Sequence, residues 1–437
     1  MEKTSLETAR RIRRQAYHRT VLPNGLRIVS APRPDAESAA VGVWMGVGAR
    51  YEPVRLNGIS HFLEHLLFKG TRTRSSRQIK ESIEGTGGSF NAFTDEEFTS
   101  VVAKVQPKDL GSTVEVLTDM VRHPKLDARE MDKERAVVLE EIRMYRDLPM
   151  QFVHDLLNTL LWPNHPLGRD IAGTPESLAR IRRRDVADFQ RRHYVPRNIV
   201  ISACGRLTHR SLVEAVTGAW KSAAAGRPAA YRKAVQRQRR PRLKVETKET
   251  EQSHFSLGFH AFPRNHPQVH ALNLLHVILG GNMSSRLFQR VREERGLAYE
   301  IGSQIKRFRD TGLFSISAGV EHKNLVPCLK VVLGELRRLR KEAVSEAEFG
   351  QAVEYLTGQI LFTLEDTVEH MCWMGESEML LGRVHAAEQV LAQIGRVKRR
   401  DLTQAARVIL RDDHLSLAVI GPVKPKAQNR ILGMLEV

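Results

Sequence analysis

Two histidines and a glutamate are spaced so that a single helix could present all three at one place. His61 and His65 lie four residues apart, and Glu64 follows His61 by three residues. On a helix these spacings put the side chains on the same side, so that both imidazoles could reach one cation. Glu64 could then take a proton from a water bound to that cation. The pattern therefore predicts a metal site with a base beside it.

The residues around this pattern favour a helix. Apolar side chains recur at helical spacing next to the histidines, and Gly70 is placed to end the helix. The chain has 17 histidines, so an ordinary amphipathic helix that happens to carry two of them is the alternative. A third ligand decides between the two interpretations, because catalytic zinc usually takes three protein groups and keeps a fourth position open.

A second helix, expected from Asp127 to Arg146, carries acids that could complete such a site. It contains Glu134, Glu140 and Glu141. Glu134 and Glu141 share a face because they are seven residues apart. Basic residues alternate with these acids, which also fits a charged surface helix in solvent. The spacing alone leaves open whether any of these acids meets the histidines.

The combined pattern resembles the pitrilysin (insulinase) family of zinc metallopeptidases, whose motif has the glutamate directly before the second histidine. Glu141 follows His65 by 76 positions, as in that family, and Glu134 also fits. The resemblance implies that His61, His65 and Glu141 bind one Zn²⁺ per chain. It implies Glu64 as general base on a zinc-bound water, and Glu134 as a second carboxylate of the catalytic centre that orients the ligands.

The segment 87–94 resembles the strand that lines the substrate in this family. Asn91 and Ala92 are the residues expected to contact substrate there. An extended peptide could add to the edge of this strand through main-chain hydrogen bonds, with little demand on its side chains. A simple hairpin with the following strand is compatible with that use.

The segment 284–299 resembles the signature of the family's second half. In that signature, the positions matching Arg286 and Tyr299 face the zinc site and bind the substrate near the scissile bond. The structural alternative is a charge on a helix surface for Arg286 and half-buried packing for Tyr299. As binding residues, they would stabilise the oxyanion that forms during hydrolysis.

The chain contains a weak internal duplication. The strand expected at 199–203, with Gly205 after it, recurs 216 residues later at 415–419 with Gly421. When Gly70 is aligned with Gly281, the second half lacks the metal motif, because Leu272, Leu275 and His276 stand where the first half has His61, Glu64 and His65. One zinc site per chain is therefore expected, built wholly in the first half.

The duplication predicts an α+β fold with two homologous domains, each a mostly antiparallel sheet covered by helices. Small residues, Pro228 and a basic run mark an exposed linker between the domains. The predicted organisation is a basic N-terminal lead-in (1–18), a zinc-binding catalytic domain (19–221), the linker (222–242) and a second domain (243–437). That second domain lacks the zinc motif and supplies substrate-binding residues.

Composition narrows the function classes. No run of 18 apolar residues exists, which argues against a membrane span. The three cysteines are widely spaced, which favours reduced thiols in a cytoplasmic protein over a disulfide framework. The net charge of +18 raises nucleic acid as a partner. The basic residues are spread along the chain without a zinc-finger or stacking pattern, so nucleic-acid binding is disfavoured.

Together these features predict a zinc-dependent endopeptidase that hydrolyses peptides or unfolded segments. The resemblance is to the short-chain form of the family, like the subunits of the mitochondrial processing peptidase, which pair to enclose a chamber. Because the zinc motif and the Arg/Tyr pair occur in the same chain, a homodimer is expected, with an unlike partner chain as the alternative. The alternatives for function are a non-catalytic scaffold or partner subunit of the same fold, and a basic nucleic-acid-binding protein.

Overall fold

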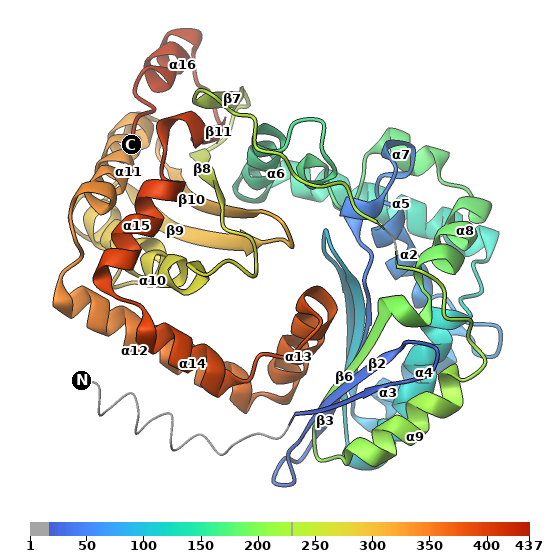
Figure 1. Cartoon of the computed structure of the whole chain (residues 1–437). Coiled ribbons are helices and arrows are strands. Elements are labelled where there is room, and N and C mark those ends of the chain that lie inside the picture. The colour runs from blue at the N-terminus through green and yellow to red at the C-terminus, as the bar shows by residue number, and fades with distance from the viewer. Residues whose placement is uncertain (1–16, 229) are drawn as a thin grey trace. The chain divides into compact units, whose positions relative to one another are not determined.

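A computed structural model describes residues 17–228 and 230–437 and divides into two compact units (Figure 1). The first unit is built from the chain up to Ile142, Arg169–Arg232 and Ile360–Val390. The second is built from Arg143–Gly168, Lys233–Gln359 and Leu391–Val437. Most of the predicted N-terminal lead-in, residues 1–16, lies outside the described residues.

The first unit is built on a six-stranded sheet in the order β1-β2-β6-β3-β5-β4. Its strands are β1 (His18–Val21), β2 (Arg27–Pro32), β3 (Ala39–Met45), β4 (Ser89–Thr94), β5 (Thr99–Val105) and β6 (Ile199–Gly205). All neighbouring pairs are antiparallel except β2 with β6, which is parallel. β3 and β6 are buried along their whole length, as expected for central strands of β-branched and small residues. β4 forms one edge of the sheet.

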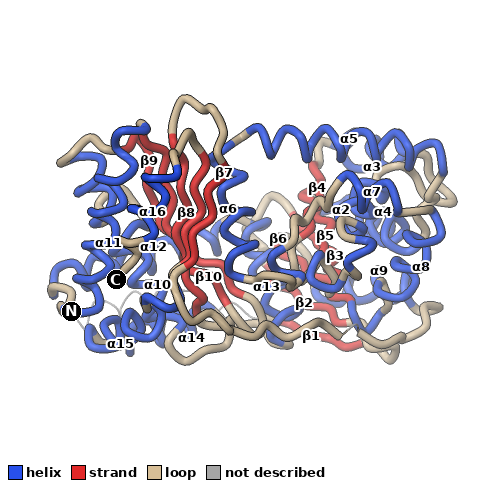
Figure 2. Tube along the Cα trace, turned by 90° about the horizontal axis from the view of Figure 1, so that it is seen from above, coloured by secondary structure: helices blue, strands red, loops and turns tan. Residues whose placement is uncertain are grey.

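One face of this sheet packs against helices of the first half of the chain (Figure 2). These helices include α2 (Ile59–Leu67), α3 (Ser76–Ile83), α4 (Leu110–Arg122), α5 (Ala128–Asp147), α7 (Pro175–Arg180), α8 (Arg183–His193) and α9 (His209–Trp220). Phe62 and Leu63 of α2 pack in the same core as Val41 and Val43 of β3. The apolar stripe read from the sequence is therefore what fixes α2 on the sheet.

The opposite face of the first sheet is covered by α13 (Thr367–Leu381), which comes from far along the chain. Met371 and Met374 pack there with Trp44 of β3. Gly375 lies so close to Trp44 that a Cβ at this position would be 2.1 Å from the indole nitrogen. The fully buried Glu378 carboxylate accepts two hydrogen bonds from Arg19 of β1, at 3.1 and 3.0 Å.

The second unit is built on a five-stranded sheet in the order β7-β11-β8-β10-β9. The strands are β7 (Arg242–Glu246), β8 (Ser253–Ala261), β9 (Ala298–Arg307), β10 (Gly312–Val320) and β11 (Ser416–Ile420), and only the β7–β11 pair is parallel. Numbered along the chain within each half, and leaving out β1, both sheets have the strand order 1-5-2-4-3. This shared topology confirms the two homologous domains of the predicted α+β fold.

Helices cover the second sheet as well. Its strands contact α6 (Pro149–Leu161), α10 (Val269–Gly280), α15 (Arg399–Ile409) and α16 (Pro425–Leu432), and α11 (Leu325–Lys341) packs on α15. Two further helices, α12 (Glu346–Glu365) and α14 (Ala387–Arg396), are each divided between the two units. α6 packs against β8 and β11, and Leu157 of α6 fills the space above Gly258 of β8. None of the helices in the described part of the chain is long and apolar enough to cross a membrane.

The two units exchange segments, which the sequence ranges do not reveal. α6 lies within the predicted range 19–221 but packs on the second sheet, whereas α13 lies within 243–437 but packs on the first. The duplication therefore predicts the order of elements along the chain. It does not predict which sheet each helix packs on, and that packing defines the compact units.

The predicted linker contains no helix or strand in its described residues before β7 begins at Arg242. Most of these residues are exposed, but two anchors fix the segment. The buried Arg50 guanidinium lies 4.2 Å from the ring centre of Tyr231 and donates to the Arg232 carbonyl oxygen at 2.9 Å. Gln238 is buried and its amide donates to the Leu415 carbonyl oxygen at 2.7 Å.

Candidate metal centre

The helix α2 that carries the two histidines is fixed at both ends. At its start, the buried carboxylate of Glu52 accepts hydrogen bonds from the Gly58 amide at 2.7 Å and the Ser60 amide at 2.8 Å. This satisfies amide groups that a helix N-terminus otherwise leaves unpaired. α2 ends at Leu67 with Phe68 as its C-cap, and Gly70, which was expected to end the helix, lies two residues further on and turns the chain with a φ of +106°. Glu52 lies outside the motif and was not anticipated.

The three predicted ligands lie close together. The His61 Nε2 lies 3.7 Å from the Glu141 Oε2, and the His65 Nε2 lies 3.6 Å from the same oxygen. One ligand atom from each of the three residues can be chosen so that all lie within 4.8 Å of one another. Within the described part of the chain, this is the one such group of three or more histidine, cysteine or acidic side chains. Glu141 comes from α5, so the site joins two helices.

The other two acids of the predicted centre lie on either side of these ligands. The Glu134 Oε2 lies 3.2 Å from the His65 Nδ1, and its Oε1 lies 2.5 Å from the Lys69 Nζ. A carboxylate only accepts hydrogen bonds, so Nδ1 of His65 is the donor toward Glu134, and Nε2 is the nitrogen that faces Glu141. Lys69 was not anticipated, although it follows His65 by four residues on the same side of the chain.

Glu64 is buried beside the ligands. Thr94 of β4 donates from its Oγ1 to the Glu64 Oε2 at 2.5 Å. Burial raises the pKa of Glu64, and the Thr94 hydrogen bond opposes this shift by stabilising the ionised form. A carboxyl group with a raised pKa is suited to take up a proton and release it again. Thr94 was not singled out from the sequence, since only the fold brings β4 beside α2.

The residues present fit a zinc ion. Two imidazole nitrogens and one carboxylate oxygen form a donor set typical of catalytic zinc. Burial, and next the neighbouring His65, lower the pKa of His61 to about 4, so the imidazole is neutral, as a ligand must be. The His61 Nδ1 is buried and has no hydrogen-bond partner among the described residues. The His65 orientation set by Glu134 is the kind of support that metal-binding histidines usually have.

The substrate-lining strand predicted around Asn91 and Ala92 is β4, the edge strand next to β5. Asn91 is exposed, and its side-chain oxygen accepts a hydrogen bond from the Ala92 amide at 2.9 Å. Ala92 packs into the core of the first unit. Thr94, which holds Glu64, ends the same strand, so one strand offers both a free edge and a contact with the base.

Arg286 and Tyr299 lie in the second unit, and the structure does not pair them. Glu348 binds the Arg286 guanidinium through two hydrogen bonds at 2.7 and 3.0 Å, and the arginine side chain is only 12% exposed. Tyr299, on β9, is 77% exposed. The Arg292 guanidinium lies over its ring, with its central carbon 4.7 Å from the ring centre. Arg292 belongs to the segment quoted for the resemblance but was not assigned a role there.

The second half of the chain has no counterpart of the metal centre in its described residues. Leu272 and Leu275 of α10 are buried in the core of the second unit. The His276 Nδ1 lies 2.8 Å from the Ser303 Oγ, and burial lowers the pKa of His276 to about 4. His276 is therefore neutral and hydrogen-bonded, and it packs within the second unit, as expected.

Comparison with known proteins agrees with this geometry. The family model described as insulinase (peptidase family M16) matches residues 27–175, and the model described as peptidase M16 inactive domain matches residues 180–356. The chain is 39% identical to an uncharacterized zinc protease of Streptomyces coelicolor, over 94% of this chain and 91% of the relative. It is 37% identical to the uncharacterized zinc protease YmxG of Bacillus subtilis, over 91% of this chain and 97% of the relative.

Solved structures share the fold. A protease from Helicobacter pylori superimposes with a TM-score of 0.88 at 22% identity and covers 93% of this chain and 100% of its own. A structure from Pseudomonas fluorescens described as a peptidase M16 inactive domain gives a TM-score of 0.87 at 17% identity, over 94% of this chain and 98% of its own. The solved structures show the fold, and the family models and the relatives show that the chain belongs to the insulinase family of zinc proteases, peptidase family M16.

Proposed function

We propose that this protein is a zinc endopeptidase that hydrolyses peptides or unfolded segments of proteins. The observation that carries the proposal is the meeting of His61, His65 and Glu141 from two helices, with the Glu64 carboxyl group buried beside them. This set combines three metal ligands with a base that is not itself a ligand. Intact motifs of this kind favour an enzyme over a non-catalytic scaffold of the same fold.

His61, His65 and Glu141 would hold the zinc ion, and Glu134 keeps the His65 ring in the orientation that binding needs. Zinc bound there supplies a Lewis acid that makes water more acidic and polarises a carbonyl group. Glu64 takes the proton of the attacking water and later gives it to the leaving amine. The Thr94 hydrogen bond holds the Glu64 carboxylate in place between these two steps.

The substrate is proposed to bind as an extended peptide along the edge of β4. The first sheet has no further strand beyond β4 among the described residues, so main-chain groups of a peptide could pair there. Recognition through the main chain makes few demands on sequence, and it excludes folded proteins that present no flexible segment. Arg286 and Tyr299 stay proposed as substrate-binding residues, as the resemblance implies, and Arg292 lies on the Tyr299 ring.

The chain is proposed to act as a homodimer that encloses the substrate in a chamber. The metal ligands and the exposed Tyr299 occur in one chain, which supports two equal, self-sufficient subunits over an unlike pair. Sedimentation at micromolar concentration should give the mass of two chains. The mass of one chain in that experiment would reject the homodimer and leave the chemistry of the site unaffected.

The decisive experiment compares the wild type with Glu64→Gln for bound zinc and for hydrolysis of a random peptide library. We expect both proteins to bind zinc, and we expect Glu64→Gln to lose hydrolysis by at least about 10²-fold, because an amide cannot accept the proton. Chelation should also stop the wild type. Unchanged hydrolysis by Glu64→Gln would reject the mechanism. A folded, zinc-loaded wild type without hydrolysis, or with steeply salt-dependent binding to nucleic acid instead, would favour the scaffold or nucleic-acid alternatives.

A further inference from the structure

Two loops connect directly to the helices that carry the metal ligands. One follows α2 and contains Gly70 and Thr71; the other precedes α5 and contains His123 and Lys125. The loops lie against each other through backbone hydrogen bonds, from the Lys125 amide to the Gly70 carbonyl oxygen at 3.0 Å and from the Arg72 amide to the His123 carbonyl oxygen at 3.1 Å. The exit of the histidine helix is thus joined to the entry of the glutamate helix.

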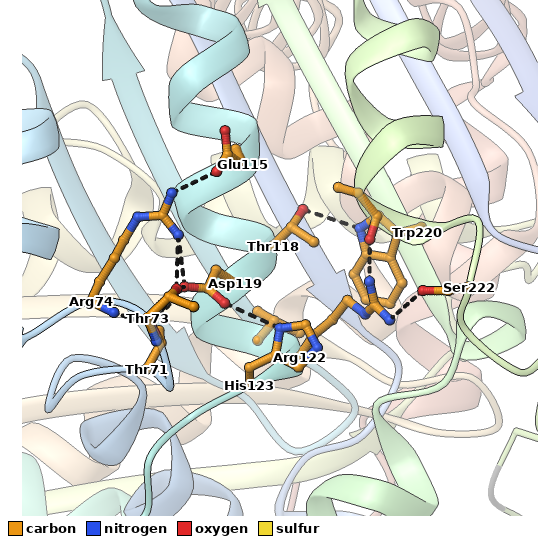
Figure 3. Close-up of polar contacts among 12 residues, drawn as sticks. Thr71, Thr73, Arg74, Glu115, Thr118, Asp119, Arg122, His123, Trp220 and Ser222 are labelled. Carbon is orange, nitrogen blue, oxygen red and sulfur yellow. Dashed lines mark hydrogen bonds and ion pairs between the residues drawn. The ribbon is translucent and has the colours of Figure 1, made fainter.

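One carboxylate adds side-chain hydrogen bonds to both loops of this junction. Asp119, in the last turn of α4, points its carboxylate at the first loop (Figure 3). Its Oδ2 accepts hydrogen bonds from the Thr71 Oγ1 at 2.6 Å, the Thr73 Oγ1 at 2.9 Å and the Arg74 Nη1 at 2.8 Å. Its Oδ1 lies 3.1 Å from the His123 Nδ1, so the same residue reaches the second loop.

The surroundings of Asp119 make these bonds strong. The residue is 8% exposed and Thr71 is 4% exposed, so water competes little for the carboxylate. Burial raises the pKa of Asp119, but the hydrogen bonds from Thr71, Thr73 and Arg74 outweigh burial and hold the pKa below its usual value. The group is therefore ionised, and its bonds to the loop are charge-assisted.

We propose that Asp119 is a positioning residue for the metal centre and sets the register of α2 against α5. The inference rests on the proposed function, because it assumes that His61, His65 and Glu141 bind zinc. Metal ligation tolerates errors of only about 0.2 Å in ligand distance, so a small slip of one helix along the other weakens binding. Glu134 of α5 contacts His65 and Lys69 beside the ligands, and the junction adds a second connection where α2 ends and α5 begins.

The test measures the dissociation constant for zinc by competition with a chromogenic chelator, together with the melting temperature of the metal-free protein. Asp119→Ala removes all the hydrogen bonds of the carboxylate to the two loops and leaves the backbone hydrogen bonds between them, and Thr73→Val removes one donor and is the milder variant. Thr118→Val is the matched control. Thr118 is the neighbour of Asp119 on α4 and is also buried. It accepts a hydrogen bond from the Trp220 Nε1 at 3.1 Å and has no hydrogen bond to either loop (Figure 3).

We expect Asp119→Ala to bind zinc about tenfold more weakly than the wild type, and Thr73→Val two- to threefold more weakly, in the range of outer residues that support a metal site. Thr118→Val should lower the melting temperature yet bind zinc within twofold of the wild type. If Asp119→Ala does not fold, Thr73→Val and Thr118→Val still decide the question.

Two results would overturn the inference. One is a folded Asp119→Ala or Thr73→Val that binds zinc as tightly as the wild type. The other is a loss of affinity in Thr118→Val as large as in the loop variants, which would mean that general destabilisation accounts for the effect. Failure of the proposed function looks different, because the wild type itself would then bind no zinc.

Discussion

At the scale of single residues, the metal centre depends on a chain of contacts that reaches beyond the ligands. His65, Glu134 and Lys69 form a line in which the carboxylate lies between the imidazole and the ammonium group. Glu134 is largely buried, so it needs a cation to balance its charge. Lys69 provides that balance and holds the carboxylate against His65.

Replacing Lys69 by methionine keeps the aliphatic stem and removes the charge. We expect zinc affinity to fall about tenfold, because Glu134 then loses the partner that fixes its orientation toward His65. Lys69→Arg should restore most of the affinity. The measurement is the dissociation constant for zinc, determined by competition with a chelator.

The control for this prediction is Lys133→Met on α5. Lys133 pairs with Glu130 at 2.7 Å on the exposed side of the helix that carries Glu134, and exposed pairs contribute little. Its loss should leave zinc affinity unchanged. Equal affinity in Lys69→Met and the wild type would show that Glu134 holds its position without the lysine.

Residue identity could be predicted where the pattern is local, and not where partners come from elsewhere in the fold. The spacing of His61, Glu64 and His65 fixes their common side on one helix. The partner of Arg286 could not be read in this way, because Glu348 lies 62 positions away on another helix. Arg286 and Arg292 have the same chemistry within one short segment, and only packing decides that Arg292 lies on Tyr299.

At the scale of elements, the helices and strands with clear periodicity were predictable to within a few residues. The expected helix 127–146 is α5, Ala128–Asp147, and Asp127 caps it by accepting hydrogen bonds from the amides of Arg129 and Glu130. The expected strand 199–203 is the first part of β6, which begins at Ile199 and continues to Gly205. These elements are determined by local propensity, capping and burial, all of which are visible in a short stretch of sequence.

The helix α13 shows why elements without clear periodicity could not be placed from the sequence. Its buried stripe includes His370, Gly375 and Glu378, so its apolar periodicity is weak. Each of these residues is buried for a tertiary reason: Tyr17 and Cys204 contact the histidine, Trp44 covers the glycine, and Arg19 pairs with the glutamate. A polar stripe of this kind looks like a surface helix until the partner strands are known.

At the scale of the whole molecule, both units contain histidines that are not ligands. They are the buried His193 and His370 in the first unit and the half-buried His260 and His276 in the second. Burial, the largest cause in each case, lowers the pKa of all four from 6.5 to about 4. Nearby positive groups, such as Arg33 for His370 and Arg307 for His276, act in the same direction.

These histidines predict that the folded protein loses stability in mild acid. Between pH 6.5 and about 4 the histidines bind protons in the unfolded chain but not in the folded chain. The free energy of unfolding is therefore highest above pH 6.5 and falls as the pH decreases through this range. From pH 7 to pH 5.5 each histidine should cost about 1 kcal/mol. Urea unfolding of the metal-free protein at the two pH values measures the loss.

The double variant His276→Gln/His370→Gln removes one such histidine from each unit, and its free energy of unfolding should fall by about 2 kcal/mol less than that of the wild type. A pH dependence as steep in the double variant as in the wild type would mean that other groups cause the acid sensitivity, since glutamine fills a similar volume but does not titrate.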